Sequence, residues 1–163
     1  MNRLTLLVLV PVCLVTMGNY CETDIIDDAG FQFWCGDALC TWEVEEGAVR
    51  KVSTWHEHDY AVELLGAPVV LTQPADGSLP SCVRIELIAD VEPSAMVVVA
   101  IDYGGNGTID WSAPIYGEGF RSMAWEVRPR SADDYDSVFI LRKSNEGRAV
   151  IAQFRVSSEC GGV

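Results

Sequence analysis

Apolar and polar residues alternate in short segments along this chain, and no segment beyond residue 28 keeps the 3.6-residue apolar period of a helix. From Val83 onward every second position is apolar, whereas Arg84 and Glu86 stand between, which is typical of a half-buried antiparallel strand. Comparable segments predict strands near residues 41–45, 49–54, 61–65, 69–72, 82–89, 95–103, 108–114, 121–127, 137–142 and 149–156. The chain is therefore predicted to be all-β, with two packed antiparallel sheets.

Two of these segments are apolar at nearly every position, and the rest are separated by turn residues. Residues 95–101 and 138–141 have no polar face, so we expect both to be central strands that are covered on both sides. Glycine supplies the positive φ that tight turns need, which predicts turns at residues 46–47, 104–107 and 145–147.

The first twenty residues have the pattern of a secretory leader. Arg3 is followed by an apolar run over residues 4–17 and then by polar residues. A retained membrane anchor is the alternative, but the run contains Pro11 and is shorter than the roughly 20 residues that a spanning helix needs. We therefore expect a signal peptide at 1–20, an acidic linker at 21–30 and one sandwich domain at 31–160.

Two kinds of cleavage site fit the end of the leader. Thr16 and Gly18 provide the small residues of an ordinary signal-peptidase site, whereas Cys21 stands where a bacterial lipoprotein carries its lipidated cysteine. Tyr20 departs from the small residues that precede such a cysteine. The sequence thus predicts an exported protein, in the periplasm, lipid-anchored through Cys21 at the outer membrane, or secreted, with no other membrane attachment.

The cysteines fit an oxidising compartment. Cys13 leaves with the leader, and if Cys21 is lipidated an even set remains at Cys35, Cys40, Cys82 and Cys160. We expect a local disulfide between Cys35 and Cys40 and a longer one between Cys82 and Cys160. Neither pair has the C-x₂-C spacing of a zinc site.

Charge and motifs exclude several classes of function. The chain has 11 Lys and Arg against 24 Asp and Glu, a formal charge of −13, so nucleic acid is a poor partner. No G-x-S-x-G, H-E-x-x-H or P-loop motif is present. We therefore expect a protein that is not an enzyme.

The order of segments from about residue 31 to 156 resembles the jelly-roll carbohydrate-binding modules of the galactose-binding-like superfamily, including those of bacterial envelope lipoproteins. The segments that carry the resemblance are residues 55–64, 69–73, 125–129, 137–142 and 147–152. Such modules often carry an acidic residue in the last strand, where this chain has Gln153. The resemblance implies a jelly-roll sandwich that recognises a carbohydrate or another cell-surface ligand. The alternative is a structural or protein-interaction envelope domain with no small ligand.

Aromatic side chains are the candidates for a glycan contact, because a planar ring covers the C–H face of a sugar. Trp125 alternates with Met123 and Val127, which predicts that it lies in the core. The other candidates are Trp55, Tyr60, Tyr103, Trp111 and Tyr116. Of these, Tyr103, Trp111 and Tyr116 flank turn-rich segments, and glycan binding is predicted to depend on Trp111 or Tyr116.

Residues 102–110 partly match a calcium-binding loop. Asp102, Asn106 and Asp110 offer oxygen ligands, but Ala113 stands where the closing bidentate glutamate belongs. A β-hairpin with glycines at its turn explains the same residues, and such a hairpin could still hold calcium.

One histidine pattern is similar to the first metal-binding motif of cupins. His56 and His58 are followed by Glu63, but such sites normally use a third histidine and this chain has two in all. A polar junction between a strand and a loop is the preferred explanation of these residues, so the metal enzyme is kept only as a third hypothesis.

Overall fold

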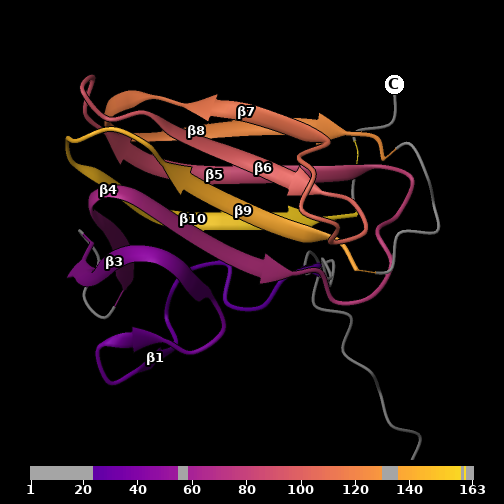
Figure 1. The fold of residues 1–163 in the computed structure, drawn as a ribbon, viewed down its shortest axis with the longest axis horizontal. Helices are drawn as coiled ribbons and strands as arrows, with labels where there is room; N and C mark the ends of the chain where they lie inside the picture. The colour runs from indigo at the N-terminus through magenta and orange to yellow at the C-terminus, as the bar shows by residue number, and fades with distance from the viewer. Residues whose placement is uncertain (1–23, 55–58, 130–135, 159, 161–163) are drawn as a thin grey trace, which may run out of the picture.

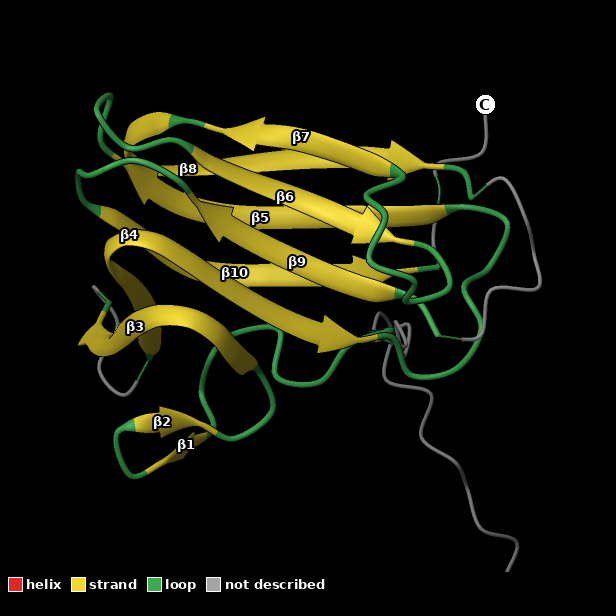
Figure 2. Cartoon of the chain, in the orientation of Figure 1, coloured by secondary structure: helices red, strands yellow, loops and turns green. Residues whose placement is uncertain are grey.

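The computed structural model describes residues 24–54, 59–129, 136–158 and 160. The regular structure in these ranges consists of strands (Figure 1 and Figure 2). The strands are β1 (Trp34–Cys35), β2 (Ala38–Leu39), β3 (Glu43–Ser53), β4 (Tyr60–Pro74), β5 (Val83–Val91), β6 (Val97–Asp102), β7 (Trp111–Ile115), β8 (Gly117–Val127), β9 (Val138–Lys143) and β10 (Ala149–Ser157). Within the described part of the chain, no helix is long and apolar enough to cross a membrane.

The strands form two layers that share β3 and β4. Hydrogen bonds connect the strands in the order β7-β6-β9-β4-β10-β5-β8, and β3 pairs with β4. Residues 69–74 of β4 pair with β9, whereas Val62 and Glu63 of the same strand pair with β10. β4 therefore crosses from one layer to the other, and all pairings are antiparallel. β7, β6, β9 and the second half of β4 form the front layer in Figure 1, and β8, β5 and β10 form the back layer.

The core lies between the layers. Phe139 of β9 and Phe154 of β10 are both fully buried, and their ring centroids are 6.1 Å apart. In β5, buried and half-buried residues alternate without a break, as predicted for a strand with one face on the core. The fold is an all-β, two-layer jelly-roll sandwich, which confirms the predicted fold class.

Two predicted breaks are absent, the one between residues 45 and 49 and the one between residues 65 and 69. The turn expected at residues 46–47 is a bulge within β3, where the pairing register to β4 shifts on both sides of Glu46. Gly47 has a φ of 80° there, so the glycine serves a bulge rather than a turn. The turns expected at residues 104–107 and 145–147 do lie between consecutive strands.

The segment expected to be a linker packs against the sandwich from residue 24 on. Ile25 and Ile26 are buried, and the backbone amide of Ile25 donates to the carbonyl oxygen of Val156 at 2.8 Å. Phe31, directly after the predicted linker, is fully buried against Trp42, with ring centroids 5.3 Å apart. Acidic neighbours concealed these apolar contacts in the sequence pattern.

Both expected disulfides are present, Cys35–Cys40 and Cys82–Cys160. The first closes the short hairpin of β1 and β2. The second joins the start of β5 to the chain just beyond β10. The predicted leader and Cys21 lie outside the described residues.

Candidate functional site

A groove of about 880 Å³ crosses the outer face of the front layer. Its floor is apolar and comes from alternate residues of three neighbouring strands: Val70 of β4, Val138 and Ile140 of β9, and Val98 and Ala100 of β6. We call this the sheet groove. The prediction that β6 and β9 are covered on both sides is wrong, because their outer residues form this open floor.

Polar side chains rise from the floor and the edges of the sheet groove. Glu45 and Glu46 lie on the β3 side, and the Thr72 hydroxyl donates to the Glu45 carboxylate at 3.0 Å. Arg142 projects from β9, and Ser112 lies on β7 at the opposite edge. Hydroxyls, carboxylates and a guanidinium thus surround an apolar strip, which suits a ligand with both C–H surface and hydroxyl groups.

The pairing register places several of these groups in one row across the strands. Glu46 lies opposite Val70, which lies opposite Arg142, which in turn lies opposite Val98. Neighbouring strands are about 4.8 Å apart, so the five strands from β3 to β7 span roughly 19 Å.

The loop between β6 and β7 closes one end of the sheet groove and contains the predicted calcium ligands. The Asp102 carboxylate accepts hydrogen bonds from the backbone amides of Asn106 (3.1 Å) and Gly107 (2.7 Å). Asp110 accepts one from the amide of Tyr103 at 2.8 Å, and the Asn106 side chain accepts one from Thr108 at 2.9 Å. All three candidate ligands therefore already stabilise the hairpin turn, and calcium binding stays a prediction.

A smaller cavity of about 260 Å³ lies at the edge between β7 and β8. Pro114, Tyr116 and Trp125 line it, and Tyr116 is 71% exposed. Ser112, Pro114 and Tyr116 are alternate exposed residues of one chain segment, so this aromatic edge continues from the rim of the sheet groove. Trp111 points inward instead and makes an edge-to-face contact with Trp125 at 6.1 Å between ring centroids.

The remaining aromatic candidates have different environments. Tyr103 is 8% exposed and belongs to the core, so the prediction that it presents a ring for stacking is wrong. Tyr103 follows the buried Ile101 by two residues, and residues two apart in an extended chain point to the same side, so the ring faces the core. The ammonium group of Lys51 makes a cation–π contact with the ring of Tyr60, with Nζ 3.6 Å from the ring centroid. Trp55 lies outside the described residues.

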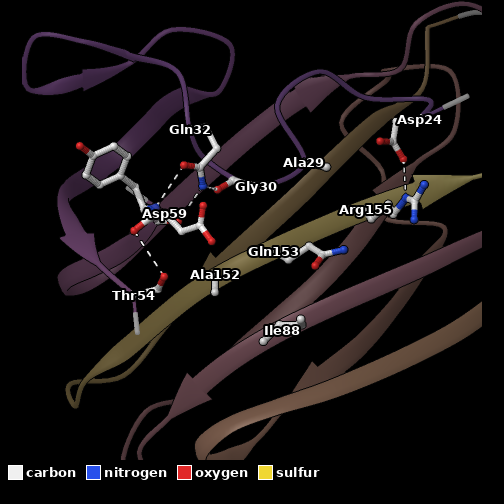
Figure 3. A pocket seen from close by; sticks show the side chains of 11 residues that line it. Asp24, Ala29, Gly30, Gln32, Thr54, Asp59, Ile88, Ala152, Gln153 and Arg155 are labelled. Atoms are coloured by element: carbon white, nitrogen blue, oxygen red, sulfur yellow. Dashed lines mark hydrogen bonds and ion pairs between the residues drawn. The ribbon is translucent and has the colours of Figure 1, made fainter. Parts of the chain in front are cut away.

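A third cavity, of about 520 Å³, lies on the outer face of the back layer (Figure 3). Ala152, at the bulge of β10, and Ile88 form its floor, with Gln153 beside them. Most of the polar groups around this N-terminal cleft are already bonded to one another. The side-chain amide of Gln32 donates hydrogen bonds to the carbonyl oxygens of Gly30 and Tyr60 and accepts one from the backbone amide of Tyr60. Arg155 forms an ion pair with Asp24 at 2.8 Å.

The cupin-like hypothesis gains no metal site from the described residues. Glu63 pairs with Arg50 and lies 3.7 Å from Arg148, and His56 and His58 lie outside the described residues. Among the described residues, one group of three side chains brings potential metal-ligand atoms close together: Cys82, Glu126 and Cys160. Its two sulfur atoms form a disulfide bond, so they are not free thiolates.

The residues that line the sheet groove were not predicted from the sequence, although one signal pointed to them. The double-sided apolar pattern of β6 and β9 has two explanations: a second covering layer, or an open surface for a ligand. The pattern alone does not distinguish them, because both remove the outer side chains from free solvent.

No family model matches the chain, and no curated protein matches it. Solved structures with a similar fold include a family 61 carbohydrate-binding module in complex with β-1,4-galactotriose, with a TM-score of 0.61 and 18% identity over 85% of this chain and 100% of that one. Another is a family 22 xylan-binding domain from Paenibacillus barcinonensis, with a TM-score of 0.58 and 9% identity over 86% of this chain and 97% of that one.

An arabinose-bound α-L-arabinofuranosidase also matches, with a TM-score of 0.65 and 13% identity over 83% of this chain. The match covers 26% of that chain, so it compares this protein with a part of the hydrolase. At these identities the likeness concerns the fold. The chain has the jelly-roll sandwich seen in carbohydrate-binding modules.

Proposed function

We propose that this chain is an exported, non-catalytic domain that binds a glycan in the sheet groove. The observation that carries the proposal is the uncovered apolar floor of the groove, bordered by hydroxyl, carboxylate and guanidinium groups. A sugar ring needs both kinds of surface, since its C–H face is apolar and its hydroxyls form hydrogen bonds. The similar folds of modules solved with or named for glycans support the same class of ligand.

The geometry of the groove carboxylates favours binding over hydrolysis. Glycosidases of the common type place two carboxyl groups on either side of the scissile bond. Glu45 and Glu46 are sequence neighbours on one wall, and Asp102 is 4% exposed and bonded to the amides of its own loop. A glycan chain across the strands would have its carboxylate contacts on the β3 side.

Export rests on the leader-like residues 1–20 together with the two disulfides. Lipid attachment through Cys21 is the form of export that would hold the domain at a membrane. Metabolic labelling with a fatty acid, compared between the full-length chain and its Cys21→Ser variant, tests that attachment.

A glycan array followed by calorimetry with the strongest ligand tests the proposed function. Ile140→Glu places a charge on the floor of the sheet groove, and we expect it to abolish binding. Ile88→Glu is the matched control, because Ile88 is also a half-buried isoleucine on an outer face but lines the N-terminal cleft. Loss of binding in Ile88→Glu alone would move the site to that cleft. Absence of any glycan ligand would favour the structural or protein-interaction alternative.

A further inference from the structure

Arg142 is an unpaired cation at the centre of the sheet groove. Within the described part of the chain, Arg142 and Arg128 are the basic residues that form no ion pair, hydrogen bond or cation–π contact. The protein has 24 acidic residues and a net charge of −13, so carboxylate partners are abundant on its surface. Because Arg142 lies in the groove and has no carboxylate partner, its hydrogen-bond donors are available to a ligand.

The position of Arg142 fixes what surrounds it. Its cross-strand neighbours on the two sides are Val70 and Val98, both apolar and half-buried. The nearest acidic residue in the same row is Glu46, two strands away, so the backbones of Glu46 and Arg142 are about 10 Å apart at the usual strand spacing. The guanidinium therefore stands alone on an apolar strip, where a ligand that covers the valines would also shield it from water.

We infer that the sheet groove recognises a glycan that carries a uronic acid, whose carboxylate binds Arg142. The inference rests on the glycan-binding function proposed above and names the class of its ligand. A guanidinium offers two parallel N–H donors that match the two oxygens of a carboxylate, which neutral sugars lack. The chemical requirement is one carboxylate above the middle of the groove.

The acidic wall limits how much charge the ligand can carry. Glu45 and Glu46 lie on the β3 side of the groove, so a carboxylate on the sugar next to them is repelled. A chain with a single or widely spaced uronic acid fits, whereas a chain with a carboxylate on every sugar does not. The groove is therefore selective for sparsely charged glycans.

Calorimetry with a matched pair of ligands tests this inference: xylotetraose, and xylotetraose that bears one glucuronic acid branch. We expect the charged ligand to bind wild-type protein about tenfold more tightly at low salt, as charge-assisted hydrogen bonds predict. The advantage should shrink as salt is raised, because the pair is partly exposed. Trigalacturonate should bind more weakly than the singly charged ligand.

Arg142→Gln should remove the advantage while neutral xylotetraose still binds, and Arg142→Lys should restore part of it. Arg128→Gln is the matched control, since Arg128 is also unpaired and exposed but does not line the groove. Equal wild-type affinity for the two ligands, or an advantage that survives Arg142→Gln, overturns the inference and leaves glycan binding intact. Failure of both ligands and of every glycan on the array overturns the proposed function and the inference together.

Discussion

The ammonium group of Lys143 donates a hydrogen bond to the carbonyl oxygen of Gly66 at a distance of 2.6 Å. It donates a second to Leu64 at 3.0 Å, and the lysine is 1% exposed. Leu64 and Gly66 lie in β4 between the half that pairs with β10 and the half that pairs with β9. Lys143, at the end of β9, therefore holds the point at which β4 crosses between the two layers.

We expect Lys143→Met to lower the free energy of unfolding by about 2 kcal/mol. Methionine retains the apolar stem, but the two carbonyl groups lose their donor, and an unsatisfied buried acceptor costs about 1–3 kcal/mol. Urea unfolding measures the difference. Arg142→Met at the neighbouring exposed position is the control and should change stability by less than about 0.5 kcal/mol. Equal stability of the two variants would show that the lysine contacts contribute nothing.

Gly47→Ala should destabilise the fold more than Gly77→Ala. The two glycines have φ values of 80° and 84°, so both substitutions carry a similar backbone strain. A Cβ on Gly47 would overlap the carbonyl oxygen of Pro68, whereas a Cβ on Gly77 meets nothing within 4 Å. We expect an extra loss of about 1–3 kcal/mol for Gly47→Ala from overpacking, measured by urea unfolding. A larger loss in Gly77→Ala would contradict this account of the bulge.

The sequence predicted the strands wherever one face was polar, and it failed where a strand continued through a glycine. Side-chain alternation located β5 to within two residues at either end, because its core face and solvent face differ sharply. β3 and β4 were each predicted as two strands, because Gly47 and Gly66 have the composition of turns. Whether such a glycine ends a strand or bends it depends on the partner strand, which lies far away in the sequence.

The candidate site was predicted less well, because local pattern does not report what covers a surface. Tyr116 and Tyr103 were both candidates for a ligand contact, but Tyr116 is exposed whereas Tyr103 lies in the core. Arg142 could not be recognised as unpaired, since ion pairs such as Arg148 with Asp90 join residues 58 positions apart. The groove itself depends on the pairing of five strands, and the sequence does not give their order.

The two disulfides should differ in their contribution to stability. Cys82–Cys160 spans 78 residues and Cys35–Cys40 spans 5, and the loop-entropy model gives roughly 4.5 and 2 kcal/mol for loops of these lengths. We expect the Cys82→Ala, Cys160→Ala double variant to lose more stability than the Cys35→Ala, Cys40→Ala double variant. Thermal unfolding of the two variants and the wild type measures the order. The reverse order would show that the β1–β2 hairpin matters more for folding than its small size implies.

Asp102 should stabilise the β6–β7 loop without a metal ion. Asp102→Ala removes the acceptor of two backbone amides, so we expect a loss of about 2 kcal/mol in both calcium-containing and chelator-containing buffer. Asp102→Asn keeps one oxygen acceptor and should lose less. A rise in melting temperature with calcium that disappears in Asp102→Asn would instead establish the predicted calcium site.

Tyr116 and Trp111 should separate ligand binding from stability. Tyr116 is 71% exposed at the aromatic edge, so Tyr116→Ala should leave the melting temperature unchanged and weaken binding of a long glycan by about 0.5–1.5 kcal/mol, the usual value of a stacking contact. Trp111 packs against Trp125, so Trp111→Ala should instead lower stability by about 2 kcal/mol.

Calorimetry with a long and a short oligosaccharide of the same sugar distinguishes these roles. The groove alone accommodates the short ligand, so only the long ligand should lose affinity in Tyr116→Ala. Equal affinity of wild type and Tyr116→Ala for both ligands would restrict binding to the floor of the groove. Loss of affinity for both would instead place the ligand on the aromatic edge itself, because the small cavity between Pro114 and Trp125 would then be the main contact.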